Sequence, residues 1–287
     1  MKLHEFIELS KASLSEIYDK DEAAAIVRVW ISDRLNVALS ALTTLSHTEI
    51  IGHQLELLQA DLLKLLKGIP MQQVLGIAWF CDLPFMVTRD VLIPRPETEE
   101  LVCLLMEEMQ NEDVKVLDIC SGSGCIAIAL KNKFPLSSVT GCDISFEALM
   151  VAAENGKKNN TDVDFLWADV AEGVWEVLEH EKFDIIVSNP PYITSIERLS
   201  MHKNVLENEP HIALFAPDDD PLIFYRQILI YSRLHLNEGG SVWFEVNKGF
   251  AIEITRMMKG FGFVEVSVEN DISGNPRFVS GFLPHFS

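Results

Sequence analysis

The sequence predicts an α/β protein with a doubly wound, mostly parallel sheet, preceded by an all-helical segment. From about residue 97 onward, buried strand patterns alternate with amphipathic helix patterns, whereas no strand pattern interrupts residues 1–70. Alternation of this kind forms right-handed βαβ units with parallel strands. The last two strand patterns have no helix between them, so they should pair as a hairpin. One of those two strands must then run antiparallel to the rest of the sheet.

Residues 1–70 are expected to form a small bundle of about four helices. Leu3, Phe6 and Leu14 recur at spacings that place them on one helical face. The longest candidate helix follows Thr48 and ends at Gly68, a residue that commonly terminates helices.

Residues 71–95 differ in character from the bundle. Gly76, Pro84 and Pro94 punctuate alternating apolar residues. This pattern favours a hairpin or an extended connector rather than a helix. We therefore expect a domain boundary here, with a third region over residues 96–287.

The third region carries the predicted sheet. Seven strand patterns are present, and helix patterns separate them except between the third and fourth and between the last two. The expected helices cover 96–109, 126–134, 146–159, 221–236 and 250–260, and the expected strands lie within 114–120, 137–144, 162–170, 182–192, 239–246, 261–270 and 276–282.

The composition excludes several classes of protein. Apolar residues make up 48% and charged residues 23% of the 287 residues, which is the balance of a globular protein with a sizeable core and not of a disordered or collagen-like chain. No apolar run reaches the roughly 18 residues of a membrane-spanning helix. The first residues carry charge every few positions and lack the apolar segment of a secretory signal. We therefore expect a cytoplasmic protein without a membrane partner.

The charge balance bears on possible partners. Lys and Arg number 23 against 43 Asp and Glu, so the formal net charge is −20. A protein that binds nucleic acid directly normally clusters Lys and Arg, and no basic run is present. Direct nucleic-acid binding is therefore disfavoured. The eight His residues show no metal-ligand spacing, so no metal is expected.

A small-residue turn joins the first strand of the predicted sheet to its helix. Such a turn lets backbone N–H groups and the helix N-terminus approach a ligand. Asp143 closes the next strand, where its carboxylate can accept hydrogen bonds from ribose hydroxyls. These features alone also fit a dinucleotide-dependent oxidoreductase or a tight turn without a ligand. The residues of the turn are Cys120, Ser121, Gly122, Ser123 and Gly124.

An acid two residues before the turn favours one ligand class. The pattern from Asp118 is Asp-x-x-x-Gly-x-Gly and not the three-glycine dinucleotide fingerprint. A carboxylate at this place suits a ligand with an amino group and a sulfonium, such as S-adenosylmethionine. Asp169, at the end of the third strand, is placed to reach an adenine, although a solvated acid explains it equally well.

The stretch Asn189-Pro190-Pro191-Tyr192 follows the fourth strand and is the most informative part of the sequence. Two prolines stiffen the turn at the carboxyl edge of the sheet, where open α/β sheets bind ligands. An amide or ring nitrogen is a poor nucleophile because its lone pair is delocalised. Acceptors aimed at its N–H bonds, here the Asn189 side-chain oxygen and the Pro190 carbonyl, can orient it during methyl transfer. The Tyr192 ring can stack on the flat group.

These residues resemble the class I S-adenosylmethionine-dependent methyltransferases, and specifically the protein-(glutamine-N5) methyltransferases that act on peptide-chain release factors. The resemblance covers nearly the whole chain, and the run Leu92–Glu99 is its most discriminating part. The other matching stretches are 70–76, 118–124, 188–193, 209–210, 213–214 and 271–277.

The resemblance implies a seven-stranded methyltransferase sheet and methyl transfer to the glutamine of a Gly-Gly-Gln tripeptide. It implies that Cys120–Gly124 and Asp143 hold S-adenosylmethionine, with Val170 at a position where many members carry Trp beside the adenine. It also implies that Asn189–Tyr192 hold the glutamine amide. The N-terminal helices would then grip the release factor, and we expect the enzyme to act as a monomer.

Two other functions remain open at this point. The nearest rival is an Asn-Pro-Pro-Tyr methyltransferase that modifies adenine in RNA or DNA, against which the charge of −20 argues. The second is a non-catalytic adaptor that retains the fold, against which the intact Asn189–Tyr192 set argues.

Overall fold

The computed structural model describes residues 1–109, 113–173, 175, 178–199 and 201–285. The chain divides into two compact units. One unit comprises Met1–Ile77 together with His202–Asn208, and the other comprises Ala78–Met201 and Glu209–Ser287. The first unit therefore contains a short segment from far along the chain.

The first unit is helical. The core is built from one face of each long helix and includes Phe6 and Trp30, both fully buried. Asn204 donates a hydrogen bond to the Tyr18 hydroxyl at 2.7 Å, and Asn208 donates one to the Gly68 carbonyl at 3.1 Å. These bonds attach the distant segment to the helices. The helices are α1 (Leu3–Leu14), α2 (Lys20–Leu35), α3 (Ala41–Thr44), α4 (His53–Leu65), α5 (Met71–Leu75) and α10 (Lys203–Asn208).

Two predictions for this part of the chain are wrong in detail. The helix expected after Thr48 begins only at His53, because Thr48 accepts a backbone hydrogen bond from Leu3 and Gly52 adopts a positive φ of 57°. Residues 71–75, expected to be extended, form helix α5. Pro70 precedes this helix and Gly76 ends it at a φ of 73°, a bracketing typical of short helices.

The predicted hairpin is present directly afterwards. Strands β1 (Ile77–Phe80) and β2 (Leu83–Met86) form a two-stranded sheet. The two turn residues, Cys81 and Asp82, both have positive φ angles, of 48° and 60°. Two-residue hairpin turns of this kind match the right-handed twist of the strands.

The second unit contains a seven-stranded sheet in the order β5-β4-β3-β6-β7-β9-β8. The first five of these strands are parallel, and β9 is antiparallel to both of its neighbours. This arrangement confirms the doubly wound sheet and its antiparallel C-terminal strand. The strands are β3 (Lys115–Ile119), β4 (Ser138–Asp143), β5 (Asp164–Trp167), β6 (Phe183–Ser188), β7 (Leu236–Glu245), β8 (Val264–Asn270) and β9 (Pro276–Phe282).

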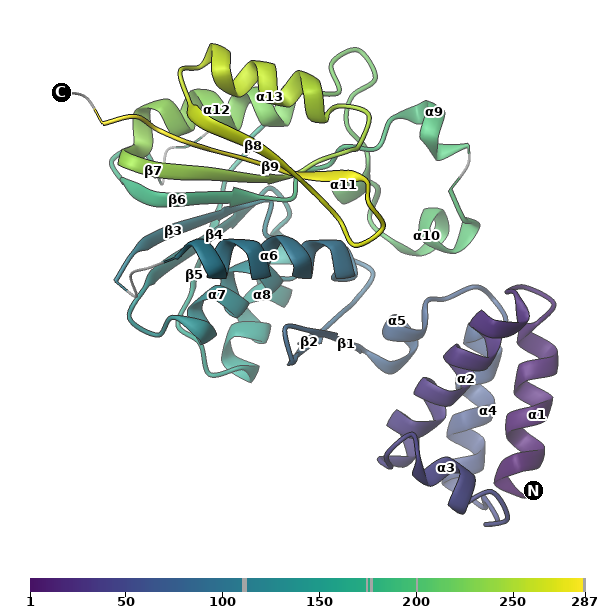
Figure 1. Cartoon of the computed structure of the whole chain (residues 1–287). Helices are drawn as coiled ribbons and strands as arrows, with labels where there is room; N and C mark the ends of the chain where they lie inside the picture. The colour runs from purple at the N-terminus through teal and green to yellow at the C-terminus, as the bar shows by residue number, and fades with distance from the viewer. Residues whose placement is uncertain (110–112, 174, 176–177, 200, 286–287) are drawn as a thin grey trace. The chain divides into compact units, whose positions relative to one another are not determined.

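Helices cover both faces of this sheet (Figure 1). Alternate strand residues point to opposite faces, so Val116 packs under one helical layer and Leu117 under the other. None of the described helices is long and apolar enough to cross a membrane. One layer holds α6 (Pro96–Glu108), α7 (Cys125–Lys133) and α8 (Phe146–Lys158), the other holds α12 (Ile223–His235) and α13 (Ala251–Gly260), and the short helices α9 (Ser195–Arg198) and α11 (His211–Leu214) follow β6.

Candidate active site

The strand order creates a switch point between β3 and β6. From β3 the chain continues to β4 on one side, while β6 lies on the other side, with Ile119 paired to Ser188 at the carboxyl end. Ligands bind at such points because the connections diverge there and leave a crevice. The turn after β3, Cys120–Gly124, and the corner after β6, Asn189–Tyr192, therefore begin side by side.

The turn after β3 is held by backbone hydrogen bonds. Ser121 N–H donates to the Cys142 carbonyl at 3.0 Å, and Gly124 N–H donates to the Ser121 carbonyl at 2.8 Å. Gly124 has a φ of 78°, and a Cβ there would lie 2.8 Å from the Phe165 ring. Only glycine fits both constraints without strain. The tight turn brings the N-terminus of α7 to the edge of the sheet.

Asp143 links this turn to the end of β4. One of its carboxylate oxygens accepts the Ser145 N–H and the other accepts the Gly122 N–H, each at 2.9 Å. Burial raises the pKa of the Asp143 carboxyl, and these N–H donors oppose that rise. Each oxygen retains a lone pair. The carboxylate can therefore accept further hydrogen bonds from a diol.

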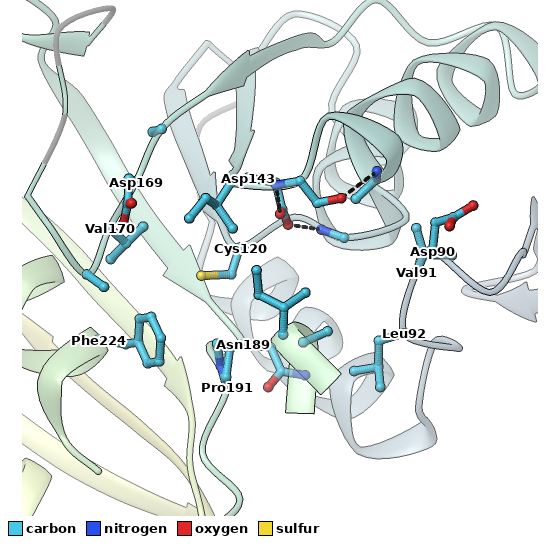
Figure 2. Close-up of a pocket in the computed structure, with 18 of the residues that line it drawn as sticks. Asp90, Val91, Leu92, Cys120, Asp143, Asp169, Val170, Asn189, Pro191 and Phe224 are labelled. Atoms are coloured by element: carbon cyan, nitrogen blue, oxygen red, sulfur yellow. Dashed lines mark hydrogen bonds between the residues drawn. The ribbon is translucent and has the colours of Figure 1, made fainter. Parts of the chain in front are cut away.

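A cavity of about 270 Å³ lies along this edge, bordered by the ends of β3, β4, β5 and β6 (Figure 2). Its lining combines apolar walls with a few acidic and amide groups, as is typical of small-molecule and cofactor sites. The polar lining residues are Asp90, Cys120, Gly122, Asp143, Ser145, Asp169, Glu172 and Asn189, and the others are Val91, Leu92, Ile144, Ala148, Ala168, Val170, Ala171, Pro191, Ile212, Ala213 and Phe224.

An ion pair between the buried Glu209 and the half-buried Arg95 holds one wall of the cavity. Glu209 accepts the Ile93 N–H at 3.1 Å and pairs with Arg95 at 2.5 Å. Leu92 and Ile212, which lie close in sequence to these partners, both line the cavity. The carboxylate thus joins two wall segments that are more than a hundred residues apart.

The corner after β6 is held by side chains from other elements. Asn189 Nδ2 donates to Thr98 Oγ1 at 3.0 Å, and Thr98 Oγ1 donates to Glu245 Oε2 at 2.6 Å. The Tyr192 hydroxyl donates to Glu245 Oε1 at 2.9 Å. Thr98 and Glu245 are both buried. The first and last residues of the corner are therefore tied to one carboxylate.

The structure brings many of the predicted site residues to one cavity but not all of them. Asp118, expected to contact the ligand, is fully buried beneath the turn, where it accepts the Ala127 N–H at 3.2 Å. Tyr192 lines a second cavity of about 240 Å³ beside Arg277. The predicted residues in the main cavity are Cys120, Gly122, Asp143, Asp169, Val170, Asn189 and Pro191, whereas Asp118, Ser121, Ser123, Gly124, Pro190 and Tyr192 lie outside its lining.

Sequence reasoning assigned no role to Thr98 and Glu245. Glu245 follows the apolar run Val242-Trp243-Phe244 at the end of β7, and a charged residue buried at such a position requires partners. That signal was available from the sequence. Thr98 belongs to the run Leu92–Glu99 that is the most discriminating part of the resemblance, but a threonine in the first turn of an amphipathic helix gave it no role of its own. Among the described residues, no group of three His, Cys, Asp or Glu side chains could hold a metal ion.

Comparisons with known proteins agree with this geometry. Residues 100–212 match the family model described as the methyltransferase small domain. The chain is 40% identical over 275 residues to the release factor glutamine methyltransferase of Bacteroides thetaiotaomicron, covering 94% of this chain and 96% of that protein. It is 38% identical over 276 residues to the protein of the same name from Flavobacterium psychrophilum, covering 93% and 94%. A methyltransferase structure from Pyrococcus furiosus aligns with a TM-score of 0.52 at 19% identity, covering 79% of this chain and 98% of that one, which establishes the fold alone.

Proposed function

Because the chain belongs to the release factor glutamine methyltransferase family, we propose that it methylates the side-chain amide nitrogen of a release-factor glutamine, with S-adenosylmethionine as methyl donor. The glutamine is that of the Gly-Gly-Gln tripeptide. The observation that supports this proposal most is that Asp143 and Asn189, from the ends of β4 and β6, line the same cavity. Release factors act at the ribosome, so we place the enzyme in the cytoplasm, and our proposal is that it acts there as a monomer.

The cavity residues fit S-adenosylmethionine. Asp143 keeps lone pairs for the ribose hydroxyls, while Val170 and Phe224 offer apolar walls for the adenine. Asp169 uses one oxygen to accept the Glu172 N–H at 3.1 Å, which leaves the other oxygen for the adenine amino group. When bound, S-adenosylmethionine supplies an electrophilic methyl group on a sulfonium.

The residues of the corner act on the glutamine amide. The Asn189 side-chain oxygen and the Pro190 carbonyl accept the two amide N–H bonds and fix the plane of the nitrogen. Their dipoles stabilise the positive charge that develops on this nitrogen as its lone pair is used. The nitrogen then becomes acidic and loses a proton to solvent, so the corner needs no ionised base.

A methylation assay tests this function. The protein is incubated with radiolabelled S-adenosylmethionine and a recombinant release factor, and the modified residue is located by mass spectrometry. We expect label in the glutamine of Gly-Gly-Gln and none in a factor in which that glutamine is replaced by alanine. Label that persists in the alanine variant, or appears in RNA or DNA instead, would overturn the proposal.

A further inference from the structure

We propose that Thr98 and Glu245 are positioning residues that turn the side-chain oxygen of Asn189 toward the substrate amide. This inference rests on the proposed function, because it concerns the acceptor that the glutamine nitrogen requires. Neither residue lines the cavity, so Thr98 acts through Asn189, and Glu245 acts through Thr98 and through Tyr192.

The Asn189 amide can in principle point either way. Its two ends have nearly the same shape, but one end is an acceptor and the other carries two donor hydrogens. A glutamine N–H needs an acceptor, so Asn189 serves only when Nδ2 faces away from the substrate. Its neighbours must therefore decide the orientation.

The Thr98 hydroxyl determines the orientation of the Asn189 side-chain amide. Its hydroxyl has a single hydrogen, which is committed to Glu245 Oε2 at 2.6 Å. Only lone pairs remain on Thr98 Oγ1, so the partner from Asn189 must be a donor. Nδ2 lies 3.0 Å away and fills this position. The opposite orientation would place two lone-pair-bearing oxygens against each other.

Glu245 fixes the direction of the whole chain of hydrogen bonds. An ionised carboxylate has no hydrogen to donate, so both Thr98 and Tyr192 must donate to it. Glu245 is only 1% exposed, and among the described residues Thr98 and Tyr192 are the side chains that hydrogen-bond to it. Burial raises the pKa of the Glu245 carboxyl, whereas the two hydroxyl donors and the charge of Arg277 lower it. The net shift of the Glu245 pKa is upward, because burial outweighs these groups. Each of the two hydroxyls nevertheless faces one oxygen of the carboxyl, which is the arrangement that an ionised Glu245 accepts.

The same carboxylate also restrains the far end of the corner. Its Oε1 accepts the Tyr192 hydroxyl at 2.9 Å, while Pro190 and Pro191 restrict the backbone between the two ends. One buried charge, at the end of β7, thus controls the first side chain of the corner through Thr98 and the last one directly.

Removing the Thr98 hydroxyl tests the proposal. Thr98→Val keeps the shape but leaves Nδ2 of Asn189 without its acceptor, so either orientation becomes available. We expect kcat for release-factor methylation to fall by about tenfold or more, with the dissociation constant for S-adenosylmethionine unchanged within about twofold. Thr98→Ser restores the hydroxyl and should keep kcat within about threefold of wild type.

The matched control is Thr255→Val. Thr255 also lies in a helix, and within the described part of the chain its hydroxyl bonds to the Ala251 carbonyl alone, at 2.8 Å. Its replacement should leave kcat within about twofold of wild type. Wild-type turnover in Thr98→Val, or an equal loss in Thr98→Ser, would overturn the proposal.

Glu245→Gln provides a second variant should Thr98→Val fold poorly. A glutamine keeps the size but presents one NH₂ group, so Thr98 or Tyr192 must face a donor. When the NH₂ group faces Thr98, it donates to the Thr98 hydroxyl, and that hydroxyl then donates to the side-chain oxygen of Asn189. The Asn189 oxygen therefore faces Thr98 and is no longer available to the substrate amide. We expect a drop in kcat of about threefold to tenfold without a change in cofactor affinity. A Glu245→Gln enzyme with wild-type kcat would contradict the role of the charge.

A spectroscopic measurement separates this inference from the proposed function. The side-chain NH₂ signal of Asn189, assigned by its loss in Asn189→Ala, is recorded by ¹⁵N NMR without release factor. It should shift in Thr98→Val and in Glu245→Gln but not in Thr255→Val. An unshifted signal would refute the positioning role even if wild-type protein methylates its substrate. A shifted signal in a protein that methylates no release factor would refute the proposed function alone.

Discussion

The two turns at the switch point are stabilised in different ways. The turn after β3 depends on backbone groups, such as the N–H groups of Ser121, Gly122 and Gly124. The corner after β6 depends on side chains, because Asn189 is held by Thr98, 91 residues away in the sequence, and Tyr192 by Glu245. Backbone bonds tolerate many side chains, whereas side-chain bonds require particular ones. The first turn therefore needs glycine and few side-chain partners, chiefly the Asp143 carboxylate that accepts the Gly122 N–H, and the second needs a full set of side-chain partners.

This difference matches the proposed roles of the two turns, in which the turn after β3 binds the cofactor and the corner after β6 orients the substrate amide. A cofactor site must hold a ligand in place, and a rigid backbone with one carboxylate at Asp143 is sufficient for that. A substrate nitrogen must be oriented within a fraction of an ångström for transfer. Fixed side-chain dipoles provide such orientation only when their own partners are also fixed.

Asn189→Ala should separate the two turns most strongly. Removing the amide deletes the proposed acceptor for the substrate but leaves the backbone bonds of the turn after β3 intact. We expect kcat to fall about a hundredfold, or roughly 2.7 kcal/mol of transition-state stabilisation, with cofactor affinity within about threefold of wild type. Steady-state kinetics with a release factor and calorimetric titration of S-adenosylmethionine measure the two effects. Equal losses in both would mean that the turns do not act separately.

The same contrast explains what could be predicted from the sequence. Strand and helix periodicity, the Gly-rich turn and the rigid Asn-Pro-Pro-Tyr stretch are local patterns, and the structure contains each of them. The absence of a helix between the last two strands was sufficient to predict that one of them runs antiparallel to the sheet, and the structure shows that this strand is β9. These features depend on residues that are close in the chain.

What could not be predicted depends on distant residues. The hydrogen bonds from Asn189 to Thr98 and from Tyr192 to Glu245 join three elements that meet only in the folded sheet. The grouping of residues 202–208 with the N-terminal helices likewise had no local signal. The short helix α5 did have one, in the bracketing Pro70 and Gly76, but these residues also fit a connector.

Gly124→Ala should damage the turn after β3 in preference to the corner. The added Cβ would lie 2.8 Å from the Phe165 ring, at a φ of 78° that disfavours alanine. We expect a loss of about 2 kcal/mol in unfolding free energy and weaker cofactor binding, while kcat at saturating cofactor changes less. Denaturant unfolding and calorimetric titration measure these quantities.

Gly262→Ala is the control for backbone strain alone. Gly262 has a comparable φ of 86°, but no atom lies within 4 Å of the added Cβ. It should cost only about 1 kcal/mol and leave cofactor affinity unchanged. If both variants lose the same stability and bind the cofactor equally well, close packing at Gly124 does not shape the site.

Asp118→Asn should give the smallest effect and refine the comparison further. Asp118 lies in the turn motif, yet its carboxylate is fully buried and burial raises its pKa to about 7. The folded state thus binds this proton more tightly than the unfolded state, whose ordinary pKa is 3.8. The resulting stability is complete below the unfolded pKa and is lost as the pH rises through the folded pKa. The wild-type protein should therefore lose about 1 kcal/mol relative to Asp118→Asn between about pH 6 and pH 7.5.

Denaturant unfolding of both proteins across this pH range measures the difference. Because Asp118 does not line the cavity, the cofactor dissociation constant of Asp118→Asn should stay within about threefold of wild type. A difference in stability that is constant with pH would mean that the carboxyl ionises normally. A large loss of cofactor affinity would instead place Asp118 in direct contact with the ligand, and the turn after β3 would then depend on a second side chain besides Asp143.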